Sequence, residues 1–177
     1  MIALACGLAV LGIIEIFHLA VTTALVRRLR AGQAGLAVEP DVGGPKAGEQ
    51  APRPSSLPGV PEDTDILLGF FSSGCPACQV QAPRFAAMVP KLAEVGARAV
   101  AVLNGIAGPS RDALASVLAP AGEPLLDDQA REVFRSFGIT ATPAFFLLRP
   151  DGTVTRKGVT VAQALTVDPR EHASAGA

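Results

Sequence analysis

The most informative stretch of the sequence reads ILLGFFSSGCPACQ, from Ile66 to Gln79. Its first half is a continuous apolar run, which is typical of a buried β-strand. Two cysteines follow, and the residues after them have the apolar spacing of an amphipathic helix. A cysteine in the first turn of a helix faces unpaired backbone N–H groups and the positive end of the helix dipole, which favours the thiolate. The pattern predicts an attacking and a resolving sulfur for thiol–disulfide exchange.

Strand-like and helix-like segments alternate beyond this stretch. We expect strands at 66–72, 98–103, 125–126, 144–148 and 153–156, and helices at 77–95, 110–118, 127–137 and 161–165. The turn sequence Pro-Asp-Gly at 150–152 predicts that the last two strands form an antiparallel hairpin. This order predicts an α/β fold, with a mixed sheet and helices on both of its faces.

Proline, glycine and polar residues set the expected helix ends. Ser110 is the expected N-cap of the second helix, and Asp127 or Asp128 that of the third, which Gly138 should end. The prolines at positions 83 and 90 predict kinks or a break in the first helix.

The N-terminal run 2–26 is apolar apart from Glu15 and His18. At about 1.5 Å per residue it is long enough to cross a bilayer core of about 30 Å. Basic residues follow the run at 27, 28 and 30, and none precede it, which argues against a cleaved signal peptide. We predict a transmembrane anchor. Glu15 and His18 share a helix face, and we interpret them as a hydrogen-bonded pair, a partner site being the alternative.

These patterns divide the chain into four parts. We expect an anchor with its basic flank at 1–30, a flexible linker rich in Pro and Gly at 31–64, a globular domain at 65–167 and a polar tail at 168–177. The net charge of −1 gives no indication of nucleic-acid binding. Three cysteines exclude a scaffold of several disulfides, and Cys6 is interpreted as a small apolar residue of the anchor.

Four further motifs accompany the cysteine pair. They are GEQAP at 48–52, Asp127 with its helix, FGITATPAFFL at 137–147 and RPDGTV at 149–154. With the strand–CPAC–helix pattern, they make the chain resemble a thioredoxin-fold protein, and more narrowly the membrane-anchored TlpA/MauD-like thiol–disulfide oxidoreductases. The resemblance extends over about residues 48–158. One departure is Gly74, where many relatives carry Trp, and this leaves substrate preference open.

The resemblance implies roles for individual residues. Cys75 would be the nucleophile, Cys78 the resolving cysteine, and Pro143 a cis-proline beside them. The substrate-binding residues implied are Pro76, Ala77, Thr142 and Pro143. No organic cofactor and no metal are required. The implied partners are protein thiols and disulfides, and an electron donor or acceptor such as a membrane redox partner.

Three other readings of the cysteine pair remain. A dedicated maturation factor for one disulfide-containing partner would use the same cysteines rarely. A thioredoxin-fold peroxidase fits Ser72, three residues before Cys75, but Leu68 stands where that motif has Pro. A zinc site needs four ligands, and the expected domain has no His and no third Cys, since the two histidines lie in the anchor and the tail.

The two lines of reasoning about location disagree. Arginines that follow the apolar run would place the redox domain in the cytoplasm by the positive-inside rule. The resemblance places it outside, where disulfides of exported proteins are handled. We expect an extracytoplasmic domain on a single-pass membrane anchor.

Overall fold

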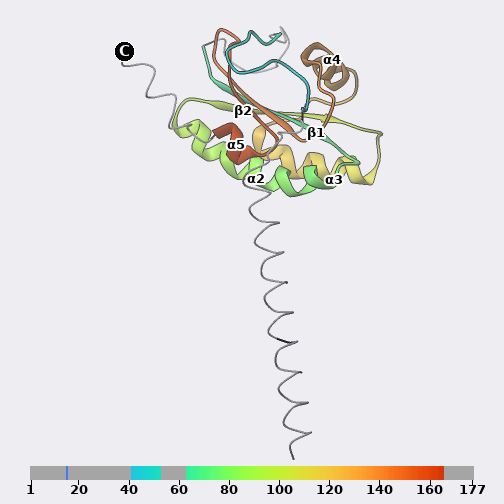
Figure 1. The fold of residues 1–177 in the computed structure, drawn as a ribbon. Helices are drawn as coiled ribbons and strands as arrows, with labels where there is room; N and C mark the ends of the chain where they lie inside the picture. Colours follow the sequence, from blue (N-terminus) through green and yellow to red (C-terminus); the bar gives the residue numbers. More distant parts are fainter. Residues whose placement is uncertain (1–14, 16–40, 53–62, 166–177) are drawn as a thin grey trace, which may run out of the picture. The chain divides into compact units, whose positions relative to one another are not determined.

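A computed structural model of the chain describes residues 15, 41–52 and 63–165. The elements in chain order are β1 (Ile66–Ser72), α2 (Pro76–Glu94), β2 (Arg98–Asn104), α3 (Pro109–Leu118), the short 3-10 helix η1 (Ala119–Ala121), α4 (Asp127–Phe137), β3 (Ala144–Leu148), β4 (Val154–Gly158) and α5 (Val161–Leu165) (Figure 1). The predicted helices and the four longer strands are therefore present near their expected bounds. The fifth, 125–126, is reduced to one parallel bridge between Leu125 and Val102.

The four strands form one mixed sheet in the order β2-β1-β3-β4. β1 and β2 are parallel, whereas β3 runs antiparallel to both β1 and β4. The helices α2, α3 and α5 lie on one side of the sheet, and α4 lies on the other (Figure 1). The expected α/β fold with helices on both faces is confirmed, and it is a thioredoxin-like fold.

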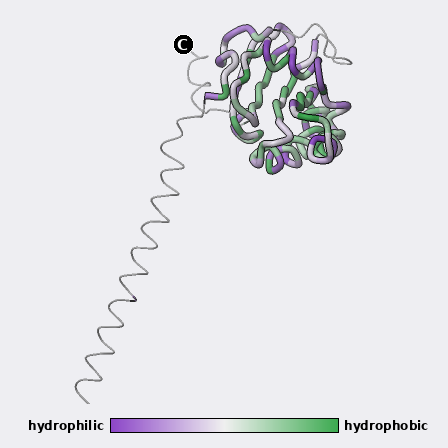
Figure 2. Tube along the Cα trace, turned by 90° about the vertical axis from the view of Figure 1, so that its right-hand side faces the viewer, coloured by the Kyte–Doolittle hydropathy of each residue, from purple (hydrophilic) through white to green (hydrophobic). Residues whose placement is uncertain are grey.

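Phenylalanine fills the core on both faces of the sheet. Successive strand residues point to opposite faces, so Phe70 packs on the α4 side and Phe71 on the α2 side. Phe71 meets Phe85 of α2 at 5.4 Å between ring centroids, and Phe70 meets Phe137 of α4 at 5.2 Å. Figure 2 shows hydrophobic residues along the strands and hydrophilic ones on the outer loops. Both helical layers are thus fixed by aromatic contacts to β1.

Residues 41–52 belong to the domain, although the sequence places them in the linker. Val42 is 2% and Ala51 7% exposed. Single antiparallel bridges join Gly43 to Ile139 and Gln50 to Thr153. The predicted linker boundary is therefore wrong for this segment. Isolated bridges require no alternation of apolar and polar residues, so the sequence of this segment has no strand-like pattern. Its Pro and Gly content alone is typical of a linker.

The predicted N-caps are also wrong. Gly108 precedes α3 and Leu126 precedes α4, and neither helix has a side-chain cap. The carboxylate of Asp127 accepts a hydrogen bond from the guanidinium of Arg111 at 2.6 Å instead of one from the helix amides. Gly138 ends α4 as predicted, with φ of 65° in the left-handed region.

The first helix is continuous from Pro76 to Glu94, so the predicted break at its prolines is wrong. Pro83 and Pro90 both lie on its exposed side. Carbonyls that lose their N–H partner there remain accessible to water, which lowers the cost of an internal proline.

The predicted anchor, apart from Glu15, and the predicted tail lie outside the described residues. Within the part of the chain that is described, no helix combines the length and the apolar character needed to cross a membrane.

Candidate active site

The first turn of α2 fixes the position of both cysteines. Cys75 is the N-cap residue, and its Sγ accepts a hydrogen bond from the backbone N–H of Cys78 at 3.1 Å. Pro76 occupies the first helical position, where the missing N–H costs nothing. The turn that leads into the helix is closed by the Cys75 N–H, which donates to the carbonyl of Ser72 at 3.1 Å. The sulfur of Cys75 therefore lies at the helix N-terminus, where the sequence predicts it.

The two sulfurs have different environments. Cys75 is half-buried, whereas Cys78 is 0% exposed, and both are free thiols. Burial, followed by the hydrogen bond with Cys75, raises the pKa of the Cys78 thiol to about 11, while the backbone N–H of Ser72, 3.5 Å from Sγ, opposes the shift. Only Cys75 is therefore accessible to another molecule.

The loop before β3 meets the cysteines from the other side. The carbonyl of Thr142 accepts a hydrogen bond from Cys75 Sγ at 3.3 Å, across 67 positions in the sequence. The pairing of Phe70 with Ala144 in the antiparallel β1–β3 ladder brings the two segments together. The peptide bond between Thr142 and Pro143 is cis, as the resemblance implies, and Pro143 is buried.

A third segment, after β2, completes the rim of the site, and sequence reasoning missed it. The N–H of Ser73 donates to the carbonyl of Asn104 at 3.1 Å. Gly105 has φ of 146° and packs so closely that a Cβ there would lie 2.1 Å from Ser73 Oγ. Ile106 follows and is 89% exposed. The sequence did carry a signal for this segment. Parallel strands carry their functional loops at the carboxyl ends, and the expected strand here is followed by Gly105 and Ile106, directly after Asn104.

The remaining predicted substrate-binding residues, Pro76 and Ala77, are both exposed beside Cys75. Three segments thus surround the half-buried sulfur: 72–79, 104–110 and 139–143. Apart from the two cysteines they contain no ionisable side chain. In residues 41–52 and 63–165, no three His, Cys, Asp or Glu side chains lie together as a metal-ligand set would require. The arrangement presents one sulfur to a partner and holds a second directly behind it.

The family model described as AhpC/TSA matches residues 40–157. The solved structures that are similar include MTB dsbF in its mixed oxidised and reduced forms, which is 24% identical, with 52% of this chain and 67% of that chain covered and a TM-score of 0.43.

Two further solved structures are similar. One is a secreted Mycobacterium tuberculosis disulfide oxidoreductase homologous to E. coli DsbE, with 19% identity, coverage of 64% of this chain and 79% of that one, and a TM-score of 0.44. The other is StoA from Bacillus subtilis, with 18% identity, coverage of 55% and 74%, and a TM-score of 0.41. No curated protein matches the chain.

Proposed function

The chain belongs to the AhpC/TSA family of thioredoxin-like proteins, and from this membership and the site geometry we propose that it is a thiol–disulfide oxidoreductase acting on protein substrates. The observation that carries the proposal is the unequal exposure of its two cysteines. Cys75 is half-buried at a helix N-cap, and Cys78 lies fully buried one turn behind it. A dithiol arranged in this way exchanges disulfides in two ordered steps.

In the first step the sulfur of Cys75 attacks a substrate disulfide as a thiolate. A bond forms between Cys75 Sγ and one substrate sulfur, the substrate S–S bond breaks, and the other substrate sulfur leaves as a thiolate that takes up a proton. The N–H of Cys78, 3.1 Å from Cys75 Sγ, stabilises negative charge on that atom. Before it ionises, the Cys75 thiol donates a hydrogen bond to the carbonyl of Thr142, which positions the sulfur from the opposite side.

In the second step Cys78 resolves the mixed disulfide. Its thiol loses a proton, and its sulfur attacks Cys75 Sγ, so that the Cys75–Cys78 disulfide forms and the second substrate thiol is released. Two electrons and two protons pass from the dithiol to the substrate. In the reverse direction the same steps oxidise a dithiol substrate, and the direction is set by the electron donor or acceptor that restores the pair.

Insulin reduction with single-cysteine variants tests the proposal. Cys75→Ser should abolish reduction of insulin disulfides by the full-length protein, because no other accessible sulfur lies at the site. Cys78→Ser should retain the first step and accumulate a mixed disulfide. Exchange activity in the Cys75→Ser variant at the wild-type rate contradicts the proposal.

The same assay separates the alternative functions. A dedicated maturation factor would reduce insulin poorly and trap one dominant partner as the Cys78→Ser variant. A peroxidase would consume hydrogen peroxide faster than it reduces insulin. If the first pattern is observed, the protein is a dedicated maturation factor; if the second is observed, it is a peroxidase.

We further propose the finer TlpA/MauD-like assignment, with residues 1–30 as a single-pass anchor and the redox domain outside the cytoplasm. The apolar run 2–26 and the motifs at 48–52 and 149–154 support it. Maleimide labelling of intact cells, with Cys6→Ser so that only the active-site pair reacts, tests the location. Labelling by a membrane-impermeant reagent, with or without prior reduction, supports an extracytoplasmic domain. Labelling by the permeant reagent alone places the domain in the cytoplasm.

A further inference from the structure

The three segments around Cys75 contain no charged side chain, and exposed aliphatic side chains lie on them and on the adjoining helices. The rim formed by segments 72–79, 104–110 and 139–143 has no ionisable group other than the cysteines, although 18% of the chain is charged. In residues 41–52 and 63–165, four large hydrophobic side chains are exposed: Val80, Val95, Ile106 and Val117. Three of the four belong to the start of α2, the loop after β2, and α3.

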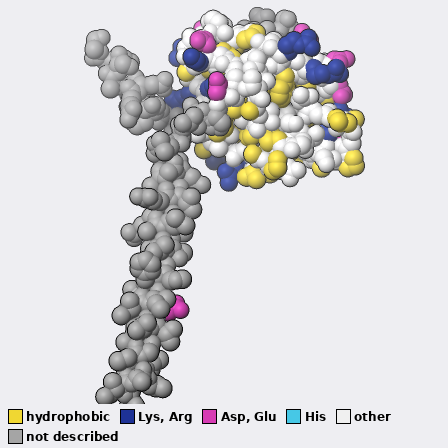
Figure 3. Space-filling model, turned by 45° about the vertical axis from the view of Figure 1, so that its right-hand side comes forward, with side chains coloured by type: hydrophobic (Ala, Val, Ile, Leu, Met, Phe, Trp, Pro, Cys, Tyr) yellow, Lys and Arg dark blue, Asp and Glu magenta, His cyan; other side chains and the backbone are white. Residues whose placement is uncertain are grey.

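A groove continues this surface away from the sulfur. It lies between α2 and α3, has a volume of about 410 Å³, and is lined by Gln79, Pro109, Ser110, Ala113, Leu114 and Val117. Gln79 directly follows Cys78, so the groove begins beside the cysteine pair. Hydrophobic side chains also gather on the lower part of the domain in Figure 3, the side on which Figure 1 shows α2 and α3, while most Lys and Arg side chains in view lie higher.

From this placement we infer that the groove between α2 and α3, which the exposed Ile106 precedes in the loop leading into α3, docks an extended, uncharged apolar segment of the protein substrate next to the cysteine that exchanges with Cys75. The inference rests on the proposed function and specifies its substrate. Such a segment suits the groove because none of its lining residues is charged, so a charged side chain seated among them would lose water without an ion-pair partner in the lining.

Two matched peptides test the inference on the full-length protein in detergent. Each carries one cysteine as a mixed disulfide with thionitrobenzoate, flanked on both sides by Leu and Val in one peptide and by Asp and Ser in the other. The second-order rate constant of the first exchange step is measured by release of the thionitrobenzoate anion from each peptide and from the mixed disulfide of thionitrobenzoate with a small aliphatic thiol. The wild type should react about tenfold faster with the apolar peptide, since one or two aliphatic side chains enter the groove.

The variants Ile106→Ser and Val117→Ser, singly and together, remove apolar surface without adding charge beside the sulfur. The double variant should lose most of the tenfold preference for the apolar peptide. Val95→Ser is the matched control, because Val95 is 77% exposed at the other end of α2. It should keep the full preference, and unchanged thermal unfolding shows that all variants are folded.

The outcomes distinguish the inference from the proposed function. Wild-type protein that exchanges with both peptides at equal rates overturns the docking inference and leaves the proposed function standing. Absence of exchange with any disulfide overturns the proposed function itself. A wild-type dimer in sedimentation that Val117→Ser converts to monomer assigns the groove to self-association and also overturns the inference.

Discussion

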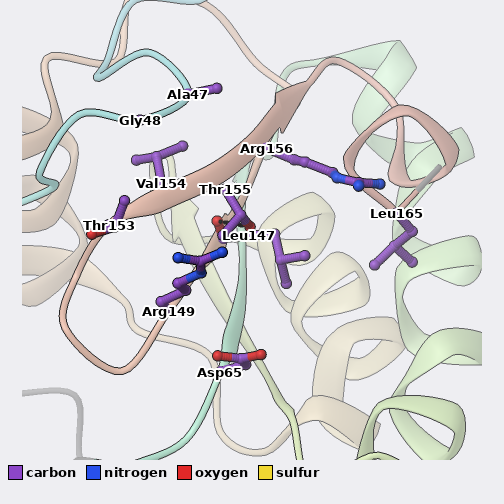
Figure 4. A pocket seen from close by; sticks show the side chains of 10 residues that line it. All are labelled: Ala47, Gly48, Asp65, Leu147, Arg149, Thr153, Val154, Thr155, Arg156 and Leu165. Atoms are coloured by element: carbon purple, nitrogen blue, oxygen red, sulfur yellow. Dashed lines mark hydrogen bonds between the residues drawn. The ribbon is translucent and has the colours of Figure 1, made fainter. Parts of the chain in front are cut away.

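The two ends of the central sheet differ in charge. At the carboxyl end of β1 lie the cysteines, with a rim that has no other ionisable side chain. At the amino end, about 20 Å away, Asp65 precedes β1, Arg98 begins β2 and Arg149 follows β3, and all three are exposed. Asp65 and Arg149 also line an open depression of about 790 Å³, in which Arg156 points away from them toward Leu165 (Figure 4).

This difference shows which properties of the molecule serve solubility and which serve chemistry. Charged groups at the amino end keep the surface there hydrated, and they lie far from the sulfur of Cys75. The carboxyl end surrounds Cys75 Sγ with backbone partners: the N–H of Cys78 donates to it, and the carbonyl of Thr142 accepts a hydrogen bond from it while it is a thiol. A partner protein can therefore cover this end without burying an unpaired charge, which would be costly. Four experiments test whether the two ends are as separate as this comparison implies.

The largest effect is expected in the pH dependence of the second exchange step. The raised pKa of Cys78, about 11, keeps it a neutral thiol at pH 7, and only the thiolate attacks. The rate of resolution should therefore rise about tenfold for each pH unit between 7 and 10 and level off as pH passes the pKa. Stopped-flow release of the second thionitrobenzoate from the reagent's symmetrical aromatic disulfide measures this step.

The first step serves as its control. In Cys78→Ser only the attack by Cys75 remains, so its pH profile is recorded separately and compared with the second phase of the wild type. A second phase that is flat from pH 7 to 9 would show that Cys78 is ionised despite its burial. The uncharged environment of the site would then have no influence on its chemistry.

The next largest effect concerns stability, in a pair of glycines from the two ends. Gly105→Ala should cost about 3 kcal/mol, because Ala is strained at φ of 146° and its Cβ would overlap Ser73 in the turn before Cys75. Gly96→Ala, at the end of α2 nearer Arg98, should cost about 1 kcal/mol, since φ is 73° but the space around it is open. Urea unfolding of the reduced proteins measures both. Equal losses would mean that Ser73 moves freely to make room.

The sequence predicted the features that depend on local pattern. The apolar run of β1 and the 3.6-residue period of α2 are read directly, and Gly138 ended α4 where expected because only a left-handed residue fits there. The position of Cys75 at a helix start was predicted from local pattern too, since an apolar strand-like run precedes the CPAC motif and helical spacing follows it. These features need no knowledge of the rest of the fold.

Three of the features that sequence reasoning missed depend on contacts between distant segments. Asp127 bonds to Arg111 and not to its own helix, Val42 packs on the domain through isolated bridges, and Gly105 meets Ser73. Each is a tertiary contact with no periodic signal. The position of segment 104–110 at the site depends on the parallel pairing of β1 and β2, which places their carboxyl ends side by side.

A charge introduced at the uncharged end should have a smaller effect, on the first exchange step. Ala77→Glu places a carboxylate on the exposed surface beside Cys75, where it opposes the negative charge of the attacking thiolate. The rate with an apolar peptide disulfide should fall about tenfold at low ionic strength and recover partly in 1 M salt, which screens exposed charges. Ala87→Glu, exposed farther along the same helix, is the matched control. Equal rates in the two variants would show that the rim tolerates charge.

The smallest effect is expected at the amino end. Arg149→Ala removes a cation from the depression that it lines with Asp65. The side chain is exposed and lies at the end of the sheet opposite the cysteines, so screening by water and salt leaves almost none of its field at Cys75. Both exchange steps should stay within twofold of the wild type, with insulin and with the peptide disulfides. A fall of more than fivefold confined to insulin would mean that large substrates reach from the sulfur to the far end of the sheet, and the charged depression would then belong to the substrate surface.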